Sequence, residues 1–167
     1  MRLTYRTGAK EIAVEFNETD PASVFPVSND VRNAANKRRS LENPEDVVYT
    51  SPDDGSSPEP FMPSGFPVGD WRITAALPRT SDYLAPFFLA TTAFKMVPSW
   101  SLSPAGDYDK PTGRLVRDSG YGLHFAKGTS TTLGCIRFIN KADLESVAKK
   151  AMEELKAGRG IRLTVLA

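Results

Sequence analysis

The stretch Gly122–Phe138, GLHFAKGTSTTLGCIRF, holds the only histidine and the only cysteine of the 167-residue chain. Its two ends, YGLHF at 121–125 and GCIRFI at 134–139, are short apolar runs bounded by glycines, which is typical of strands. Gly, Ser and Thr fill most of the connection between them. The stretch therefore predicts two neighbouring strands, with His124 on the first and Cys135 at the start of the second.

More strands are expected on both sides of this stretch. Some segments there alternate polar and apolar residues, and others are rich in β-branched and aromatic residues. They are expected within residues 1–16, 70–77, 86–97 and 160–167. Residues 140–160 instead place apolar side chains three or four apart, which predicts a helix that begins near Asn140 and ends near Gly158. A short helix is expected at about 29–41. The fold class is therefore mainly β, with one C-terminal helix and a short N-terminal helix.

Two segments have the composition of loops. Residues 43–67 hold six prolines among Ser, Asp and Gly, and proline removes backbone donors and restricts φ. Residues 99–120 are rich in turn-forming residues and predict a second loop. No second core is evident beyond residue 67, so residues 1–167 are interpreted as a single domain with an excursion at about 43–67.

Bulk composition excludes several classes of function. A formal net charge of +1 gives no basic face for nucleic acid. No apolar run reaches the roughly 18 residues of a membrane span, and the N-terminus alternates instead of forming the apolar block of a signal peptide. One cysteine cannot form an internal disulfide, and one histidine with one cysteine cannot supply an ordinary structural zinc site. We therefore expect no metal and no cofactor.

The spacing around Cys135 is compatible with nucleophilic chemistry. A thiol is a useful nucleophile as the thiolate, and a neighbouring imidazole, here His124, is the usual base. Gly134 permits a tight bend and a close approach of substrate to the backbone N–H groups of Gly134 and Cys135, which could hold an oxyanion. In a strand, Arg137 would project to the same side as Cys135 and could lower the thiol pKa or bind a carboxylate.

A structural interpretation competes with this one. A lone cysteine in an apolar strand is often a small buried hydrophobic residue, and a lone histidine is often a satisfied core or surface residue. The chain would then be a non-catalytic cell-wall or partner-binding β-domain. Reaction of the folded protein with a thiol reagent separates the two interpretations, because a buried Cys135 reacts only after unfolding.

The order of His124, a Ser/Thr/Gly-rich gap and Thr132-x-Gly134-Cys135-Ile136-Arg137 resembles the catalytic domain of L,D-transpeptidases, the YkuD-like superfamily. The segment GFPVGDWRIT, residues 65–74, is similar to a strand entry of the same enzymes. The resemblance covers about residues 61–138. Leu133 stands where the family usually has a second histidine, Phe125 replaces a glycine, and the gap between His124 and Cys135 is shorter than usual.

The resemblance implies a YkuD-like β-sandwich or barrel and a cysteine transferase or hydrolase that acts on peptidoglycan stem peptides. Cys135 would be the nucleophile, His124 the base, and Arg137 would orient a carboxylate or support the thiolate. Thr132 and Tyr121 would contact substrate, although packing is the alternative for Tyr121. L,D-transpeptidation, D-amino-acid exchange and L,D-carboxypeptidase trimming all stay open, as does a cysteine endopeptidase of the cell wall.

The short gap and the compact size are more similar to the L,D-transpeptidase-like toxins that type VI secretion systems deliver. The implied partners are then a secretion apparatus or an immunity protein, besides peptidoglycan stem peptides. The implied place of action is the periplasm or cell envelope of a bacterium. The missing signal peptide fits delivery that does not use the Sec pathway, and it also fits a trimmed mature form.

Overall fold

The computed structural model describes the chain except for residues 30–47, 50–58, 63, 81–85 and 128–133. The chain folds into two compact units. The first contains residues 1–31, 65–93 and 120–167, and the second contains residues 32–64 and 94–119. The chain therefore leaves the first unit twice and returns twice. The interpretation of residues 1–167 as one domain stays a prediction.

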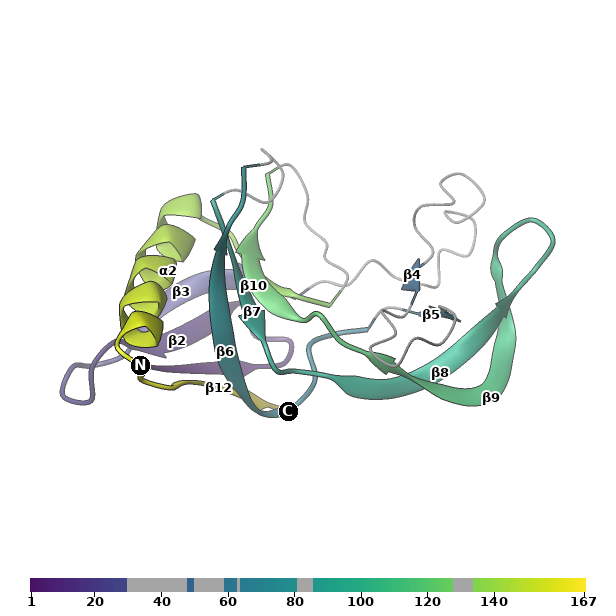
Figure 1. The fold of residues 1–167 in the computed structure, drawn as a ribbon, viewed down its shortest axis with the longest axis horizontal. Coiled ribbons are helices and arrows are strands. Elements are labelled where there is room, and N and C mark those ends of the chain that lie inside the picture. The colour runs from purple at the N-terminus through teal and green to yellow at the C-terminus, as the bar shows by residue number, and fades with distance from the viewer. Residues whose placement is uncertain (30–47, 50–58, 63, 81–85, 128–133) are drawn as a thin grey trace. The chain divides into compact units, whose positions relative to one another are not determined.

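The first unit is a closed barrel of eight strands, so the prediction of a mainly β fold is confirmed (Figure 1). Around the barrel, the order of the strands is β1, β12, β6, β7, β10, β11, β3 and β2. Their bounds are β1 (Arg2–Arg6), β2 (Glu11–Glu15), β3 (Ser23–Ser28), β6 (Gly69–Pro78), β7 (Phe87–Thr91), β10 (Gly122–Phe125), β11 (Ile136–Phe138) and β12 (Ile161–Leu166).

Two of the strand pairs in the barrel are parallel. β1 pairs with β12 over five residues, from Arg2 opposite Arg162 to Arg6 opposite Leu166. β10 pairs with β11 over three residues, Leu123 with Ile136, His124 with Arg137 and Phe125 with Phe138. The remaining neighbours around the barrel are antiparallel. The short β10–β11 pair carries the residues that the sequence analysis selects.

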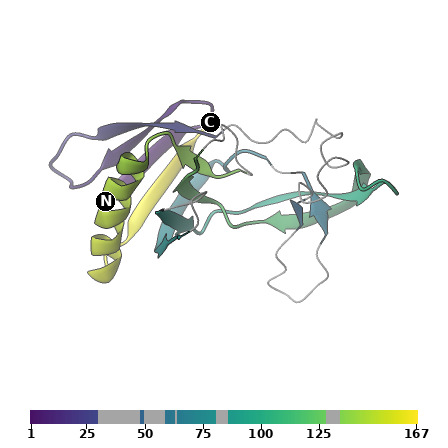
Figure 2. The same ribbon diagram turned by 90° about the horizontal axis from the view of Figure 1, so that it is seen from above.

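The barrel and the helix α2 (Lys141–Lys156) share one hydrophobic core. The buried positions of β12 alternate along the strand, as expected for a sheet with one face inward. The helix contributes Leu144, Val147, Ala148 and Ala151, and it contacts strands β6, β7, β10, β11 and β12. Figure 2 shows it lying alongside β12, the yellow strand. The predicted C-terminal helix is thus confirmed, and Gly158 ends it with a φ of 69°.

The second unit is a four-stranded sheet in the order β4, β5, β8 and β9. β4 (Val48–Tyr49) and β5 (Pro60–Phe61) lie within the proline-rich segment. β8 (Lys95–Leu102) and β9 (Tyr108–Asp118) form a long hairpin, so the interpretation of residues 99–120 as a loop was wrong. β9 is an edge strand, where proline is tolerated because one row of backbone donors faces solvent.

The short N-terminal helix expected at about 29–41 lies, apart from Asn29, outside the described residues. In the part of the chain that the structure describes, no helix is both long and apolar enough to cross a membrane.

Candidate functional site

The pairing of β10 with β11 brings the predicted site residues together. His124 lies directly opposite Arg137 in the parallel register, and Cys135 immediately precedes β11. The paired register begins with Leu123 opposite Ile136, so Cys135 lies next to the first pair and His124 belongs to the second pair.

The faces of the two strands separate the core from the site. Leu123 and Ile136 are fully buried in the hydrophobic core. Because side chains alternate along a strand, His124 and Arg137 project to the opposite face of the sheet. Cys135 also alternates with Ile136 and is partly exposed. The expectation that His124 turns away from its apolar neighbours agrees with this arrangement.

The chain before Cys135 bends at Gly134, which has a φ of 121°. Residues other than glycine rarely adopt this backbone conformation, because their Cβ atom clashes with the backbone. The predicted bend at Gly134 is therefore present. The Cys135 Sγ lies 4.0 Å from the carbonyl oxygen of Gly120, which precedes β10. The thiol thus faces the backbone just before β10, the strand that contains His124.

Asn29 fixes this bend from a distant part of the sequence. Its side-chain Nδ2 donates to the carbonyl oxygens of Gly134, at 2.7 Å, and Cys135, at 2.8 Å. Its Oδ1 accepts a hydrogen bond from the Phe66 backbone N–H at 3.1 Å. The sequence analysis did not select Asn29 for the site. Its position at the end of β3, next to β11 in the barrel, becomes evident only from the strand order.

His124 lies between Phe88 of β7 and Arg137 of β11. Its ring stacks on Phe88, with 6.3 Å between centroids and 23° between planes. Its Nδ1 lies 3.1 Å from the Phe125 carbonyl oxygen, which can only accept, so Nδ1 carries the proton and Nε2 is the basic nitrogen.

The surroundings of His124 favour the neutral imidazole. The residue is 7% exposed, and this burial lowers its pKa from the ordinary value of 6.5. The Phe125 carbonyl opposes the shift, while the positive charge of Arg137 lowers the pKa further. His124 is thus neutral at pH 7, as a general base must be.

Arg137 is a buried cation. It is 8% exposed, and its Nη1 lies 3.5 Å from the Ala126 carbonyl oxygen. Among the described residues, its Nε has no hydrogen-bond partner and no carboxylate forms an ion pair with it. A cation in this setting favours a nearby anion, whether a thiolate or a bound carboxylate.

The two residues expected to contact substrate differ in placement. Tyr121 is 2% exposed and packs in the core against Phe66, with 5.2 Å between ring centroids. This burial favours the packing alternative for Tyr121. Thr132 lies outside the described residues.

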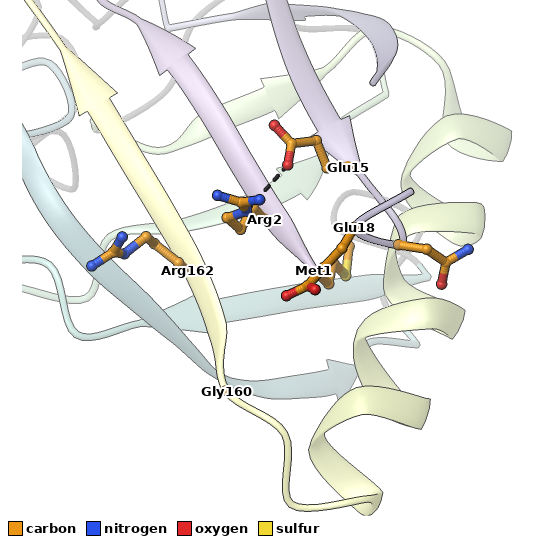
Figure 3. Close-up of a pocket in the computed structure, with 7 residues that line it drawn as sticks. Met1, Arg2, Glu15, Glu18, Gly160 and Arg162 are labelled. Carbon is orange, nitrogen blue, oxygen red and sulfur yellow. Dashed lines mark ion pairs between the residues drawn. The ribbon is translucent and has the colours of Figure 1, made fainter. Parts of the chain in front are cut away.

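Two of the cavities that described residues line border the barrel. One, of about 320 Å³, is lined by Arg137, Asn29 and Lys10 among others. The second, of about 300 Å³, lies beside β1 and β12 and is lined by Arg2, Glu15 and Arg162 among others (Figure 3). There Arg2 pairs with Glu15 at 3.1 Å. The Nε of Arg162 lies 3.9 Å from a carboxylate oxygen of Asp70, which is outside the lining. The cations of the second cavity thus have anionic partners within the chain.

Within the described ranges, no three His, Cys, Asp or Glu side chains come together as a metal site would require. Cys135, His124 and Arg137 offer the chemistry of a thiol, an imidazole and a guanidinium.

Comparison with known proteins identifies no family: no protein-family model matches the chain, and no curated protein matches it.

Proposed function

We propose that this chain is a cysteine acyl-transfer enzyme that acts on peptidoglycan stem peptides through a thioester on Cys135. The observation that carries the proposal is the parallel pairing of β10 with β11, which brings the strand of the only histidine beside the segment that contains the only cysteine. The resemblance of the motif around Cys135 to L,D-transpeptidases supplies the substrate class.

Three further features support this role. Cys135 is partly exposed, so a substrate can reach it. The lowered pKa of His124 keeps its imidazole neutral and able to accept the thiol proton. The two Asn29 hydrogen bonds hold the carbonyl groups around Cys135, which in turn fixes the direction of the neighbouring N–H groups.

In the proposed reaction, His124 takes the proton from the Cys135 thiol, and the sulfur attacks the carbonyl carbon of an L,D-amide bond. A C–S bond forms and a tetrahedral oxyanion is held by the backbone N–H of Cys135, assisted by that of Gly134. The C–N bond then breaks, and His124 returns the proton to the leaving amine. An amine that attacks the thioester gives a cross-link or an exchanged D-amino acid, and water gives a trimmed stem peptide.

The experiment is mass spectrometry of purified muropeptides after incubation with a free D-amino acid and either the protein or its Cys135→Ala variant. New cross-links, exchanged stems or trimmed stems with the protein alone are expected. The type of product identifies the acceptor. Cleavage elsewhere in the peptide would indicate a cysteine endopeptidase instead. Unchanged muropeptides with a folded sample would reject the proposal.

A non-catalytic binding domain is the second candidate, and the burial of His124 is the observation that favours it. The rate at which iodoacetamide modifies Cys135 in the folded protein separates the two. A rate above that of free cysteine at pH 7 supports catalysis, because a paired thiol is more ionised. A rate well below that of free cysteine supports a structural thiol.

We further propose that the protein acts in the periplasm or cell envelope. The toxin branch of the resemblance would add a secretion apparatus and an immunity protein as partners. Expression directed to the periplasm or retained in the cytoplasm of a bacterial host tests this. Lysis only on periplasmic expression, abolished by Cys135→Ala, is the expected result for a toxin.

A further inference from the structure

The cavity of about 320 Å³ beside Arg137 has an unusual charge balance. Its walls come from the turn between β1 and β2, the end of β3 and the residues of and after β11. Backbone hydrogen bonds hold these walls together, from Val27 N to Lys10 O at 2.8 Å and from Ile139 N to Pro26 O at 3.1 Å. Lys10 and Arg137 line it, and none of the described residues that line it is an aspartate or a glutamate.

Arg137 supplies a desolvated positive charge to this cavity. Only 8% of the residue is exposed, and its Nε lacks a hydrogen-bond partner in the described part of the chain. The contact with the Ala126 carbonyl oxygen at 3.5 Å is long for a hydrogen bond. A buried charge is costly unless it is paired, so an anion in the cavity would gain more from Arg137 than from an exposed arginine.

Lys10 adds a second cation at the exposed rim. Its backbone is fixed by the hydrogen bond from Val27, while its side chain is exposed and lines the cavity. The second cavity of the barrel differs in this respect, because its arginines have carboxylate partners within the chain. Charge alone therefore favours an external anion in the cavity of Lys10 and Arg137.

The size and the remaining walls narrow the ligand class. A volume of about 320 Å³ is near the lower end for ligand pockets, which suits one end group and not a large polyanion. Val27, Pro26 and Ile139 provide apolar surface beside the two cations. A guanidinium matches the two oxygens of a carboxylate in one plane. These features fit a carboxylate on a short aliphatic stem better than a phosphate.

We propose that this cavity is a binding site for the carboxylate of an aliphatic acid or acidic peptide residue, held by Arg137 and Lys10. Asn29 connects it to the cysteine, because its side chain lines the cavity and donates to the Cys135 carbonyl. The inference shares Arg137 with the proposed function, but binding in the cavity does not require Cys135 to react.

The test is an NMR titration of the Cys135→Ala protein with pentanoate, pentanamide and inorganic phosphate. The Arg137 Nε–H signal, assigned by its loss in Arg137→Lys, reports on the buried cation, and the Val27 amide signal reports on the wall. Pentanoate is expected to shift both signals to saturation. The neutral amide is expected to shift neither, and phosphate is expected to bind more weakly than pentanoate.

Variants locate the binding site. Lys10→Met should weaken pentanoate binding about twofold to fivefold, as for an exposed ion pair. Arg137→Lys should weaken pentanoate binding about tenfold or more. For this variant the affinity is measured from the Val27 amide signal. Lys149→Met removes one exposed cation from α2, away from the cavity, and should leave the affinity unchanged.

Several results would overturn the inference: no shift with pentanoate, an equal response to pentanamide, equal weakening by Lys10→Met and Lys149→Met, or tighter binding of phosphate. The outcome is distinguishable from that of the proposed function. If the protein binds pentanoate but leaves muropeptides unchanged, the carboxylate site is supported and the proposed enzyme activity is rejected. If the protein processes muropeptides but does not bind pentanoate, the enzyme activity is supported and the carboxylate site is rejected.

Discussion

Asn29 and Cys135 are 106 positions apart in the sequence, yet the Asn29 side chain donates a hydrogen bond of 2.8 Å to the Cys135 carbonyl oxygen. The same amide group also holds the Gly134 carbonyl and accepts the Phe66 N–H. One side chain thus joins the three chain segments of the first unit, including the segment that contains Cys135. In an enzyme, such a contact orients the nucleophile without touching the reacting atoms.

Asn29→Ala removes these three hydrogen bonds. We expect the free energy of unfolding to fall by about 1–3 kcal/mol, because partly buried backbone groups lose their partner. Muropeptide conversion should fall further than this loss of folded protein explains, since the bend at Gly134 is no longer held. Urea unfolding and product analysis measure both effects. The exposed Asn17→Ala is the control and should change stability by less than about 0.5 kcal/mol. Equal effects of the two substitutions would contradict the role of Asn29.

The protonation of His124 should determine how the reaction rate falls at low pH. Burial lowers its pKa below 6.5, so the midpoint of its protonation lies below pH 6.5. A protonated imidazole cannot take the thiol proton. The rate of muropeptide conversion should therefore fall in acid with a midpoint below pH 6.5. A pH profile measured from 4.5 to 8 tests this, with circular dichroism to verify folding. An acid limb with its midpoint above pH 6.5 would contradict His124 as the base.

Glu154 predicts a loss of stability in acid. Two hydrogen bonds from Arg159, at 2.8 and 2.9 Å, lower its pKa to about 2 from the ordinary 4.5, with Lys150 assisting and burial opposing. A carboxyl group with a lowered folded pKa stabilises the fold fully above pH 4.5 and loses this contribution as pH falls toward 2. Thermal unfolding of Glu154→Gln should lack this part of the pH dependence. The exposed Glu153→Gln on the same helix should retain it, and an identical pH response of the two variants would be inconsistent with the assignment.

The close packing around Gly122 leaves no space for a larger residue at this position beside His124. A Cβ atom there would overlap the Phe88 ring and lie 2.7 Å from the Leu89 carbonyl oxygen, so β10 and β7 would have to separate. We expect Gly122→Ala to destabilise the fold by about 1–3 kcal/mol and to displace Phe88, which stacks on His124. At Gly160, a Cβ atom meets nothing within 4 Å. Gly160→Ala should therefore change the free energy of unfolding by less than about 1 kcal/mol. Chemical denaturation compares the two, and a neutral Gly122→Ala would show that the strands can adjust.

Parts of this fold were predictable because their signals are local. The helix Lys141–Lys156 follows from the spacing of Leu144, Val147, Ala148 and Ala151, each of which is buried. The opposite directions of His124 and Leu123 follow from strand alternation. In both cases the spacing of residues along the chain determines which side chains face the core, so the sequence alone predicts which of them are buried.

Other parts depend on contacts between distant residues. The hairpin of β8 and β9 was missed because Pro111 and Gly113 suggest turns, although an edge strand tolerates them. Glu154 is buried on α2 because Arg159 and Lys150 neutralise it, which no apolar pattern indicates. Asn29 and Lys10 reach the site only through the order of strands around the barrel. A single sequence does not reveal that order.

The position of β12 between β1 and β6 has a consequence for synthesis on the ribosome. The two strands that it joins are synthesised well before their shared partner, Ile161–Leu166. Until then, β1 and β6 each expose an unpaired row of backbone donors and acceptors, which can pair with other chains. The nascent barrel would therefore depend on protection of these edges, and the rate of its closure would decide between folding and aggregation.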